Sequence, residues 1–287
     1  LGVLCDLCGS SLPLSVSSPF AFFMRYDGID NDRRGAHMKI AVMADIHGNT
    51  FALQAVLRGI ERRGIDTILN VGDILDGPLD PKGTFELLMK HNVISLAGNG
   101  ERLVLEGLDG EPASASFANV IEQADDAMLD WLKNLPFHIV WEDKVYGCHG
   151  SPDSDVTYLL EELHPGFVGI RKNDELDEML KDVKQSVVVC GHSHVNHVVQ
   201  TENKLIVNPG SLGLPAYDDD QPVFHVMECY TPHARYAVLE FRDEAAPIVE
   251  QVMVPYEIEK AAKMAERNHR PDWAVSLRTG RVASSFR

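Results

Sequence analysis

Six short apolar runs, each about the length of one β-strand, alternate with segments of helical periodicity after residue 38. The runs cover residues 39–44, 67–71, 93–97, 144–148, 186–190 and 205–207. The helical segments cover residues 49–63, 85–91, 113–135 and 174–183. This alternation predicts an α/β protein whose core is centred on a β-sheet, with helices packed on the faces of the sheet.

Three later apolar runs follow one another with only short turns between them. They cover residues 224–229, 236–241 and 248–254, and they predict antiparallel strands that close a second sheet. A helix is expected over residues 257–267, and Pro271 and Gly280 mark the ends of a last short helix over 272–279. Because no linker interrupts the pattern, we expect one domain over residues 38–287.

Residues 1–37 differ from the rest of the chain. They are rich in Ser, Pro, Phe and Leu and show no periodicity, and Met38 opens the first strand. A signal peptide is not indicated, because the first basic residue, Arg25, lies behind Pro13 and Pro19. We interpret residues 1–37 as a leader that is disordered or lies outside the fold.

Composition limits the classes of partner. The chain has 287 residues, 45% of them hydrophobic, and a formal net charge of -17, which disfavours holding a nucleic-acid polymer by surface charge. No apolar run approaches the roughly 18 residues of a membrane-spanning helix. Its five cysteines are too scattered for a disulfide framework. We therefore expect a soluble, cytoplasmic protein without a membrane partner.

Asp, Asn or His follows five of the apolar runs, usually beside a glycine. These residues are Asp45, His47, Asp73, Asn99, His149, His192 and His194. The carboxyl ends of strands are where α/β sheets build their sites, since the connecting loops converge there. In extended chain, residues i and i+2 point the same way, so Asp45 with His47, and His192 with His194, should each act as a pair.

Each of these residues alone has an ordinary explanation, such as a turn or a helix cap. Seven of them on five strand ends instead predict a metal centre. Imidazole mixed with carboxylate and amide oxygen suits Mn, Fe, Zn, Ni or Co better than Ca or Mg. Seven ligands exceed the needs of one tetrahedral ion, so we expect two divalent ions that share one carboxylate.

The spaced blocks resemble those of the calcineurin-like metallophosphoesterases, in particular the small bacterial phosphodiesterase-like branch. The family blocks D-x-H, G-D-x-x-D, G-N-H-[DE], H-G and G-H-[ST]-H are matched in order. Their counterparts are Asp45-Ile-His47, Gly72-Asp73-Ile-Leu-Asp76, Gly98-Asn99-Gly100-Glu101, His149-Gly150 and Gly191-His192-Ser193-His194. Five blocks in order are specific, whereas any one alone is not.

This resemblance implies a fold of two mixed β-sheets packed as a sandwich and flanked by helices. It also implies that Asp45, His47 and His194 hold one ion, that Asn99, His149 and His192 hold the other, and that Asp73 bridges both. Asp73, Asn99 and His149 would form the catalytic centre, where a metal-bridging hydroxide attacks the phosphorus of a small phosphoester. Asn99 and Arg102 are the candidate substrate contacts, although a solvated helix-face arginine is the more ordinary role for Arg102.

One position departs from the family pattern. Gly100 stands where the family usually has a histidine that is regarded as the acid for the leaving group. Since glycine cannot donate a side-chain proton, a phosphodiester or phosphoanhydride with a weakly basic leaving group is favoured over an alkyl monoester. Gly100 could also leave space for a second ester group. We expect Asp76 to structure its loop and Tyr217-Asp218-Asp219-Asp220 to form a solvated turn.

Two alternatives remain at this point. The first is a non-catalytic metal-binding scaffold for protein interactions, to which loss of the histidine at Gly100 would be a step. The second is a phosphomonoesterase or protein phosphatase, although Gly77-Pro78 replaces the Arg-Gly pair expected there. Neither the native metals nor the oligomeric state follows from the sequence.

Overall fold

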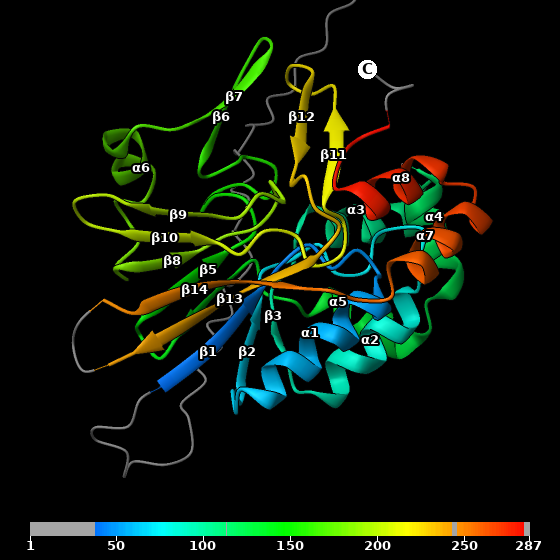
Figure 1. Cartoon of the computed structure of the whole chain (residues 1–287), viewed down its shortest axis with the longest axis horizontal. Coiled ribbons are helices and arrows are strands. Elements are labelled where there is room, and N and C mark those ends of the chain that lie inside the picture. The colour runs from blue at the N-terminus through cyan, green and yellow to red at the C-terminus, as the bar shows by residue number, and fades with distance from the viewer. Residues whose placement is uncertain (1–37, 113, 243–245, 284–287) are drawn as a thin grey trace, which may run out of the picture.

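The computed structural model describes residues 38–112, 114–242 and 246–283, so the predicted leader over 1–37 lies outside the described residues. Its two larger sheets have five strands each (Figure 1). The first, in the order β14-β13-β1-β2-β3, consists of β1 (Met38–Met43), β2 (Thr67–Asn70), β3 (Ile94–Ser95), β13 (Ala234–Phe241) and β14 (Ile248–Val254). The second, in the order β4-β5-β8-β10-β9, consists of β4 (His138–Trp141), β5 (Val145–Cys148), β8 (Val187–Val189), β9 (His197–Gln200) and β10 (Leu205–Asn208). Both sheets are mixed, as expected.

The two sheets share an apolar core, which makes them a sandwich. Successive side chains of a strand point to opposite faces. In β1, Ile40 and Val42 face inward and belong to one buried cluster with Val145 of β5 and Val187 of β8. Ala41 and Met43 of the same strand belong to a different cluster, which faces the helices. Both faces of β1 are therefore buried, which explains its uninterrupted apolar sequence.

Eight helices are present in the described residues. They are α1 (Thr50–Arg62), α2 (Pro81–Lys90), α3 (Asn99–Leu108), α4 (Ala115–Gln123), α5 (Asp126–Lys133), α6 (Asn173–Met179), α7 (Ile258–Arg267) and α8 (Pro271–Thr279). All except α6 lie on the side of the first sheet, and α6 lies beside the second sheet (Figure 1). On α1, Leu53, Val56 and Ile60 are spaced at helical intervals and are buried together against this sheet.

Several predicted elements differ in extent from the observed ones. The helix predicted over 113–135 is two helices, because the Asp125 side chain accepts the Met128 N–H and starts α5 anew. The helix predicted over 85–91 begins earlier, at Pro81, where Asp80 caps it. The segment over 174–183 is helical only to Met179.

The prediction that the late antiparallel strands close a second sheet was wrong. β13 pairs antiparallel with β1, with Met38 opposite Phe241, so β13 and β14 extend the first sheet. The other late run forms β12 (His225–Glu228), which pairs only with β11 (Ala216–Asp219) in a separate hairpin. The edge of β1 was open to pairing, and nothing local in the sequence shows which strand a distant apolar run will join.

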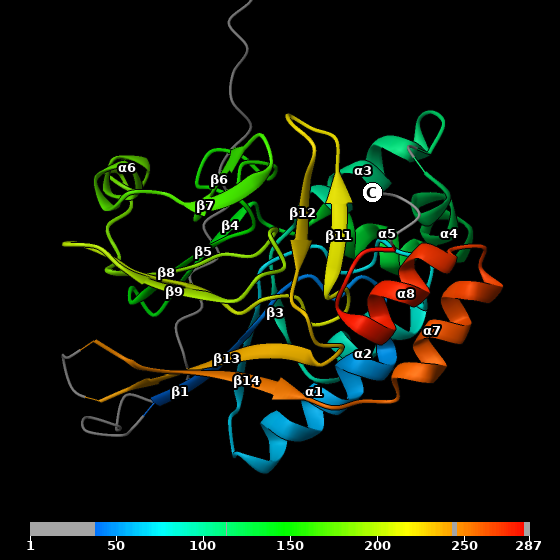
Figure 2. The ribbon, with the colours of Figure 1, turned by 45° about the horizontal axis from the view of Figure 1, so that its top comes forward.

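The strand directions bring the loops together at one edge. β1, β2 and β3 run parallel, and so do β5, β8 and β10, so their carboxyl ends lie where connecting loops converge. Two hairpins stand beside this edge, β11–β12 and the pair β6 (Glu161–His164) and β7 (Phe167–Ile170) (Figure 2).

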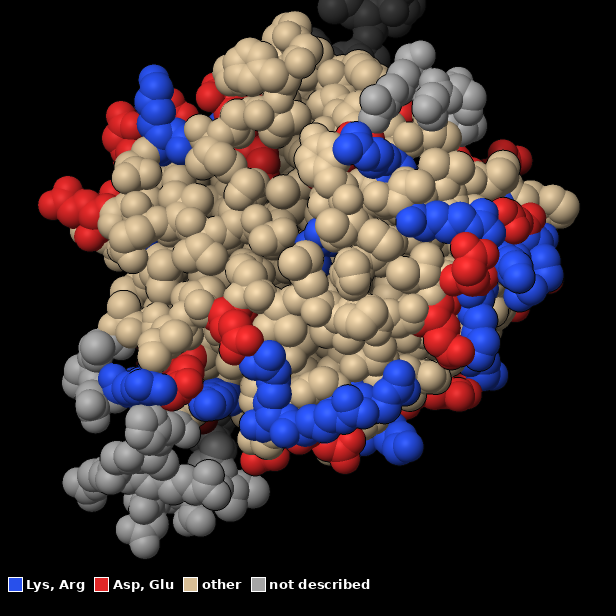
Figure 3. Space-filling view, in the orientation of Figure 1, with Lys and Arg blue, Asp and Glu red and all other residues tan. Residues whose placement is uncertain are grey.

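Charged side chains lie mainly toward the margins of the face in Figure 3. Basic groups gather over α1, where Arg58, Arg62 and Arg63 are exposed, and both signs mix over α7 and α8. Many are paired, as Arg63 is with Glu250 at 2.7 Å. In the described part of the chain, no helix has the length and apolar character needed to span a bilayer.

Asn49 joins the first sheet edge to a distant loop, and its loss should destabilise the fold. Its buried side chain accepts the Ala52 N–H at the start of α1 and donates to the Gly213 carbonyl at 2.9 Å. Asn49→Ala removes a helix cap and leaves a buried carbonyl unpaired, so we expect a loss of about 2–4 kcal/mol in unfolding free energy. Urea unfolding measures this. Asp125→Ala, which removes an exposed cap, should cost only about 1 kcal/mol, and equal losses would contradict the role of the Gly213 bond.

Candidate metal centre

The strand ends bring the seven predicted residues into two groups, which are buried except for the partly exposed Asn99 and His192. Three ligand atoms of Asp45, His47 and His194 lie within 4.8 Å of one another, and so do those of Asp73, His149 and His192. Asn99 joins the second group, because its Oδ1 is 3.0 Å from His149 Nε2. This division follows the one that the family resemblance implied. Asp73 also forms a group with His47 and Asp76, so it lies between the two halves of the centre.

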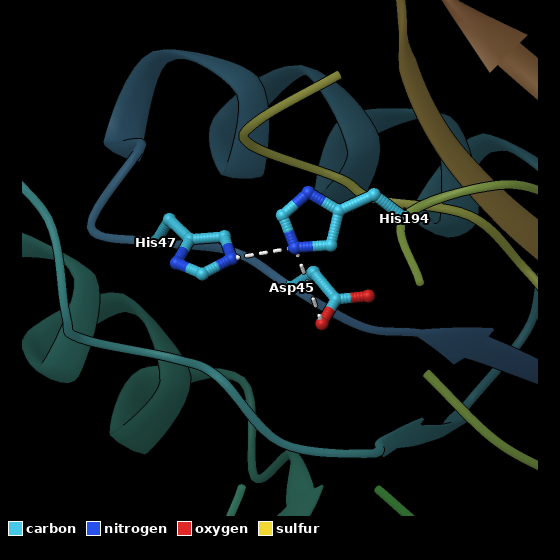
Figure 4. A group of neighbouring side chains, drawn as sticks. All are labelled: Asp45, His47 and His194. Carbon is cyan, nitrogen blue, oxygen red and sulfur yellow. Dashed lines mark hydrogen bonds and ion pairs between the residues drawn. The ribbon is translucent and has the colours of Figure 1, made fainter. Parts of the chain in front are cut away.

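The first group is drawn in Figure 4. His47 and His194 point their Nε2 atoms at each other across 3.0 Å, and His194 Nε2 is 3.8 Å from Asp45 Oδ1. All three side chains are buried. The nitrogen and oxygen atoms thus converge on a small volume.

Each histidine has one ring nitrogen held by an acceptor outside the centre. These contacts are His47 Nδ1 to Asp76 Oδ2 at 3.0 Å, His149 Nδ1 to the Val71 carbonyl at 2.8 Å, His192 Nε2 to the Val156 carbonyl at 3.2 Å and His194 Nδ1 to the Leu214 carbonyl at 2.6 Å. A carbonyl oxygen only accepts, so the ring nitrogen facing it carries the hydrogen. The other nitrogen of each neutral ring then presents its lone pair to the centre, which is the usual arrangement of metal-ligating histidines. His192 presents Nδ1, whereas the other three present Nε2.

Most of the side-chain groups that face one another inside the centre are acceptors, and backbone N–H groups such as that of Gly100 are among the few donors that reach them. His149 Nε2 faces Asn99 Oδ1 at 3.0 Å and Asp73 Oδ1 at 3.3 Å, and Asp45 Oδ2 is buried without a hydrogen-bond partner among the described residues. Converging lone pairs repel unless a cation lies between them. The mixture of imidazole, carboxylate and amide oxygen therefore fits borderline divalent cations at both groups.

The crowding of these groups also shifts their pKa values. Burial lowers the pKa of His47, but the neighbouring Asp76 carboxylate overcomes it and raises this pKa to about 10. Burial likewise lowers the pKa of His149, but the Asp73 carboxylate overcomes this effect and raises the pKa to about 10. Burial lowers the pKa of His194 well below its ordinary range, and the charge on His47 lowers it further. Burial raises the pKa of Asp45 to about 7, against the attraction of His149.

The backbone at the ligands is strained. Ten non-glycine residues in the described ranges have positive φ, and half of them are candidate ligands: Asp45, His47, Asp73, His192 and His194, with φ between 51° and 67°. Such conformations cost on the order of 1–3 kcal/mol each, so the surrounding bonds must impose them. The expectation of extended chain was therefore wrong, and although Asp45 and His47 still share a group, His192 and His194 fall in different groups.

Glu101 imposes much of this geometry, a role that the sequence reasoning missed. Its buried carboxylate accepts backbone N–H groups of Asp73, Ile74, Leu75 and Gly98 at 2.8–3.2 Å. It thus ties the loop after β2 to the start of α3. The signal was present, since a glutamate three residues after a helix N-cap is the capping-box pattern.

Asp76 does more than structure its loop. Its Oδ2 holds His47, and its Oδ1 is buried and lies 2.4 Å from the place that a Cβ on Gly100 would occupy. The space beside Gly100 is therefore filled by a carboxylate, and the idea that it admits a second ester group was wrong. Gly100 instead lets its own N–H reach Asp73 Oδ1 at 2.8 Å.

Arg102 is bonded to carboxylates in this structure rather than turned to the ligands. Its guanidinium holds Asp155 at 2.7 and 3.2 Å and Glu106 at 3.2 Å. Asp155 precedes Val156, whose carbonyl holds His192. Arg102 thus links α3 to the loop that orients His192, and a phosphate contact would require it to leave Asp155.

Hydrogen bonds from neighbouring elements hold the loop between β8 and β9 in place. Ser193, between the two histidines, donates to Glu161 Oε1 at 2.7 Å and accepts from Asn208 Nδ2 at 3.1 Å. Tyr217 donates to the His192 carbonyl at 3.1 Å, and its ring lies 4.5 Å from that of His194. The prediction of a solvated turn at 217–220 was therefore wrong, because Tyr217 belongs to β11 and faces the centre.

Comparison with known proteins decides the family. The family model described as the calcineurin-like phosphoesterase superfamily domain matches residues 38–231, which include all seven candidate ligands. This chain belongs to the calcineurin-like phosphoesterase superfamily. Members of this phosphoesterase family are metal-dependent hydrolases, in agreement with the donor set found at the strand ends.

Several relatives share most of this phosphoesterase chain. An uncharacterized protein of Methanocaldococcus jannaschii is 28% identical over 256 residues, which are 82% of this chain and 94% of the relative. A metallophosphoesterase structure from Sphaerobacter thermophilus has a TM-score of 0.64 at 22% identity and covers 84% of this chain and 98% of its own. A hypothetical protein from Pyrococcus horikoshii has the same TM-score at 20% identity, covering 86% and 100%. Both structures show the same fold.

The phosphoesterase domain has a contribution from beyond the matched residues. α8 follows the matched range and places Trp273 edge-on against the ring of His47, with 5.8 Å between ring centroids. No local signal in the sequence connects Trp273 to the centre.

Glu161 should make stability depend on pH. Burial raises its pKa to about 7 from 4.5, so the folded state disfavours its ionised form and stability falls as pH rises between these values. Glu161→Gln keeps an acceptor for Ser193 but cannot ionise. We expect the unfolding free energy of this variant, relative to the unsubstituted protein, to increase by about 1–3 kcal/mol between about pH 5 and pH 8 in urea titrations. Glu162→Gln, at a partly exposed neighbour, should show no such trend, and a flat difference for Glu161→Gln would contradict the assignment.

Gly100→Ala should weaken metal binding. The new Cβ would lie 2.4 Å from Asp76 Oδ1 and 3.0 Å from Asp73 Oδ1, so Asp76 must move away from His47. We expect the affinity for Mn²⁺, measured by calorimetry, to fall by about 10–100-fold, as when a ligand loses its supporting partner. Gly59→Ala is the matched control, since this helical position has only the Tyr236 hydroxyl at 3.7 Å. Unchanged affinity in Gly100→Ala would show that Asp76 does not support the centre.

Proposed function

We propose that this protein is a phosphodiesterase with a two-metal centre, most active with Mn²⁺ and located in the cytoplasm. The observation that carries the proposal is the pair of largely buried ligand groups with Asp73 between them. Two ions bound there would acidify a water molecule and offset the charge on the phosphoryl oxygens. Membership of the phosphoesterase superfamily supports this use of the donor set.

The chain's own residues supply orientation. Asp45, His47 and His194 would hold one ion, and Asn99, His149 and His192 the other, with Asp73 reaching both. The carbonyls of Val71, Val156 and Leu214 keep the lone pairs of three imidazoles directed inward. Such outer contacts fix the tautomer and ring orientation before any ligand arrives.

The absence of a side chain at Gly100 bears on the substrate. No imidazole stands there to protonate a leaving group, and such acid catalysis is worth typically about 10²–10⁴-fold. Asp76 fills the adjacent space but its carboxylate is committed to His47. A small phosphodiester whose leaving alcohol is acidic needs no such proton, so it is the preferred substrate class. An alkyl phosphomonoester should react poorly.

The test compares a diester with its monoester. The full chain is loaded with Mn²⁺, its metal content is measured by elemental mass spectrometry, and hydrolysis of bis(p-nitrophenyl) phosphate and of p-nitrophenyl phosphate is followed by release of p-nitrophenol. We expect two ions per chain and a higher kcat/KM for the diester. Asp73→Ala should lose at least about 100-fold in kcat/KM, because a shared ligand is removed.

Asp109→Asn, an exposed position after α3, serves as the control and should retain full activity. If the metal-loaded protein hydrolyses neither ester faster than Asp73→Ala does, the enzymatic proposal fails and a non-catalytic scaffold is favoured. Faster hydrolysis of the monoester would contradict the conclusion drawn from Gly100.

A further inference from the structure

A cavity of about 580 Å³ lies between the β11–β12 hairpin and α8. The hairpin and helix stand side by side in Figure 2 and are in contact through β11. The aromatic residues Tyr217, Phe224 and Trp273 line it, and Phe224 is 48% exposed. The volume is sufficient for a small organic group.

The cavity adjoins the first ligand group. Tyr217, which lines it, also packs on the ring of His194, and Trp273, which lines it too, meets the edge of His47. Leu214 is a further lining residue, and its carbonyl holds His194 Nδ1. The cavity is therefore separated from two ligands of the first group by single side chains.

The charges around the cavity are unbalanced. Arg270 is the only cationic side chain in the lining, and its guanidinium is bonded to Asp272 at 2.6 Å, so these two neutralise each other. Three further carboxylates, from Asp218, Asp219 and Asp220, line the same cavity. None of the three is in an ion pair among the contacts found in the described residues. This excess of negative charge repels a second phosphate and attracts a cation.

Aromatic faces add to this preference. Quaternary and primary ammonium groups bind over aromatic rings by cation–π attraction, which increases with exclusion of water. Arg270 already lies over the Trp273 ring, with 5.3 Å to its centroid, which shows that this ring accepts a cation. Phe224 and Tyr217 lie in the same lining as the three carboxylates.

We propose that this cavity binds a positively charged ester substituent, so that the preferred substrate is a zwitterionic phosphodiester with an alkylammonium group. This rests on the proposed function for the hydrolytic step and adds the class of substrate. The metal centre holds the phosphate, while the cavity between β11 and α8 holds the ammonium group. Nucleoside polyphosphates are disfavoured because their additional phosphates would meet Asp218, Asp219 and Asp220.

Two diesters that differ only in charge test the proposal. They are p-nitrophenyl phosphorylcholine and its neohexyl analogue, in which carbon replaces the ammonium nitrogen. We expect the full, Mn²⁺-loaded chain to hydrolyse the choline ester with a kcat/KM at least about fivefold higher, since one carboxylate near a cation is worth on the order of 1 kcal/mol even in water. The preference should decrease at high salt, because the carboxylates are near the surface.

The double variant Asp219→Asn, Asp220→Asn should abolish the preference and leave hydrolysis of the neohexyl ester unchanged. Both residues are exposed, so folding is not at risk. Glu202→Gln, in the turn between β9 and β10, is the control and should keep the preference. Equal rates for the two esters, or a preference that survives the double variant, would overturn the proposal while leaving the phosphodiesterase function intact.

A binding measurement keeps the test independent of catalysis. Choline should change the tryptophan fluorescence of the protein through Trp273, and neohexanol at the same concentration should not. Trp273→Phe should remove the response, whereas Trp141→Phe, at a residue in the core between the sheets, should retain it. A choline response without any turnover would sink the proposed function but not the cation site, and absence of the response would sink the cation site.

Discussion

The structure depends on holding together, at the candidate metal centre, acceptor groups that repel one another. Imidazole lone pairs, carboxylates and one amide oxygen converge at the carboxyl edge of the sheets, and few hydrogen atoms are available to separate them. Burial makes this costly, because there is no water to satisfy the groups. The Asp76 and Asp73 carboxylates raise the pKa values of His47 and His149, which favours positively charged imidazoles beside the carboxylates. Divalent cations would offset the cost of burial more completely, and that difference is the driving force for loading the centre.

The strands, the loop backbone and the hydrogen bonds around the centre prevent these groups from moving apart. The parallel strands deliver them to one edge, and positive φ angles turn five of them inward. Glu101 fixes two loops through four backbone donors, while Asp76 and three carbonyl groups fix the four imidazole rings. These hydrogen bonds, made by residues around the candidate ligands, thus offset the cost of strain and burial. A change in these bonds acts on the centre without removing a ligand.

The sequence was most informative where the chemistry is local. An apolar run followed by Asp, Asn or His can be read from neighbouring residues, so the α/β class was predicted, as was the gathering of the seven candidate ligands. The partner of β13 could not be, because strand pairing depends on which edge is free in three dimensions. The same holds for Tyr217 and Trp273, which reach the centre by packing. Gly100 was misread for a related reason, since the space beside it belongs to Asp76, a residue distant in the chain.

The position of α8 has a consequence for biosynthesis. Asp45 and His47 leave the ribosome early, but β13, which covers the edge of β1, and α8, which covers His47, are among the last parts of the described chain to be made. All seven candidate ligands precede β13 and α8 in the chain, so they are synthesised before the elements that cover them. Docking of α8 against His47 is therefore the last step that closes the first ligand group.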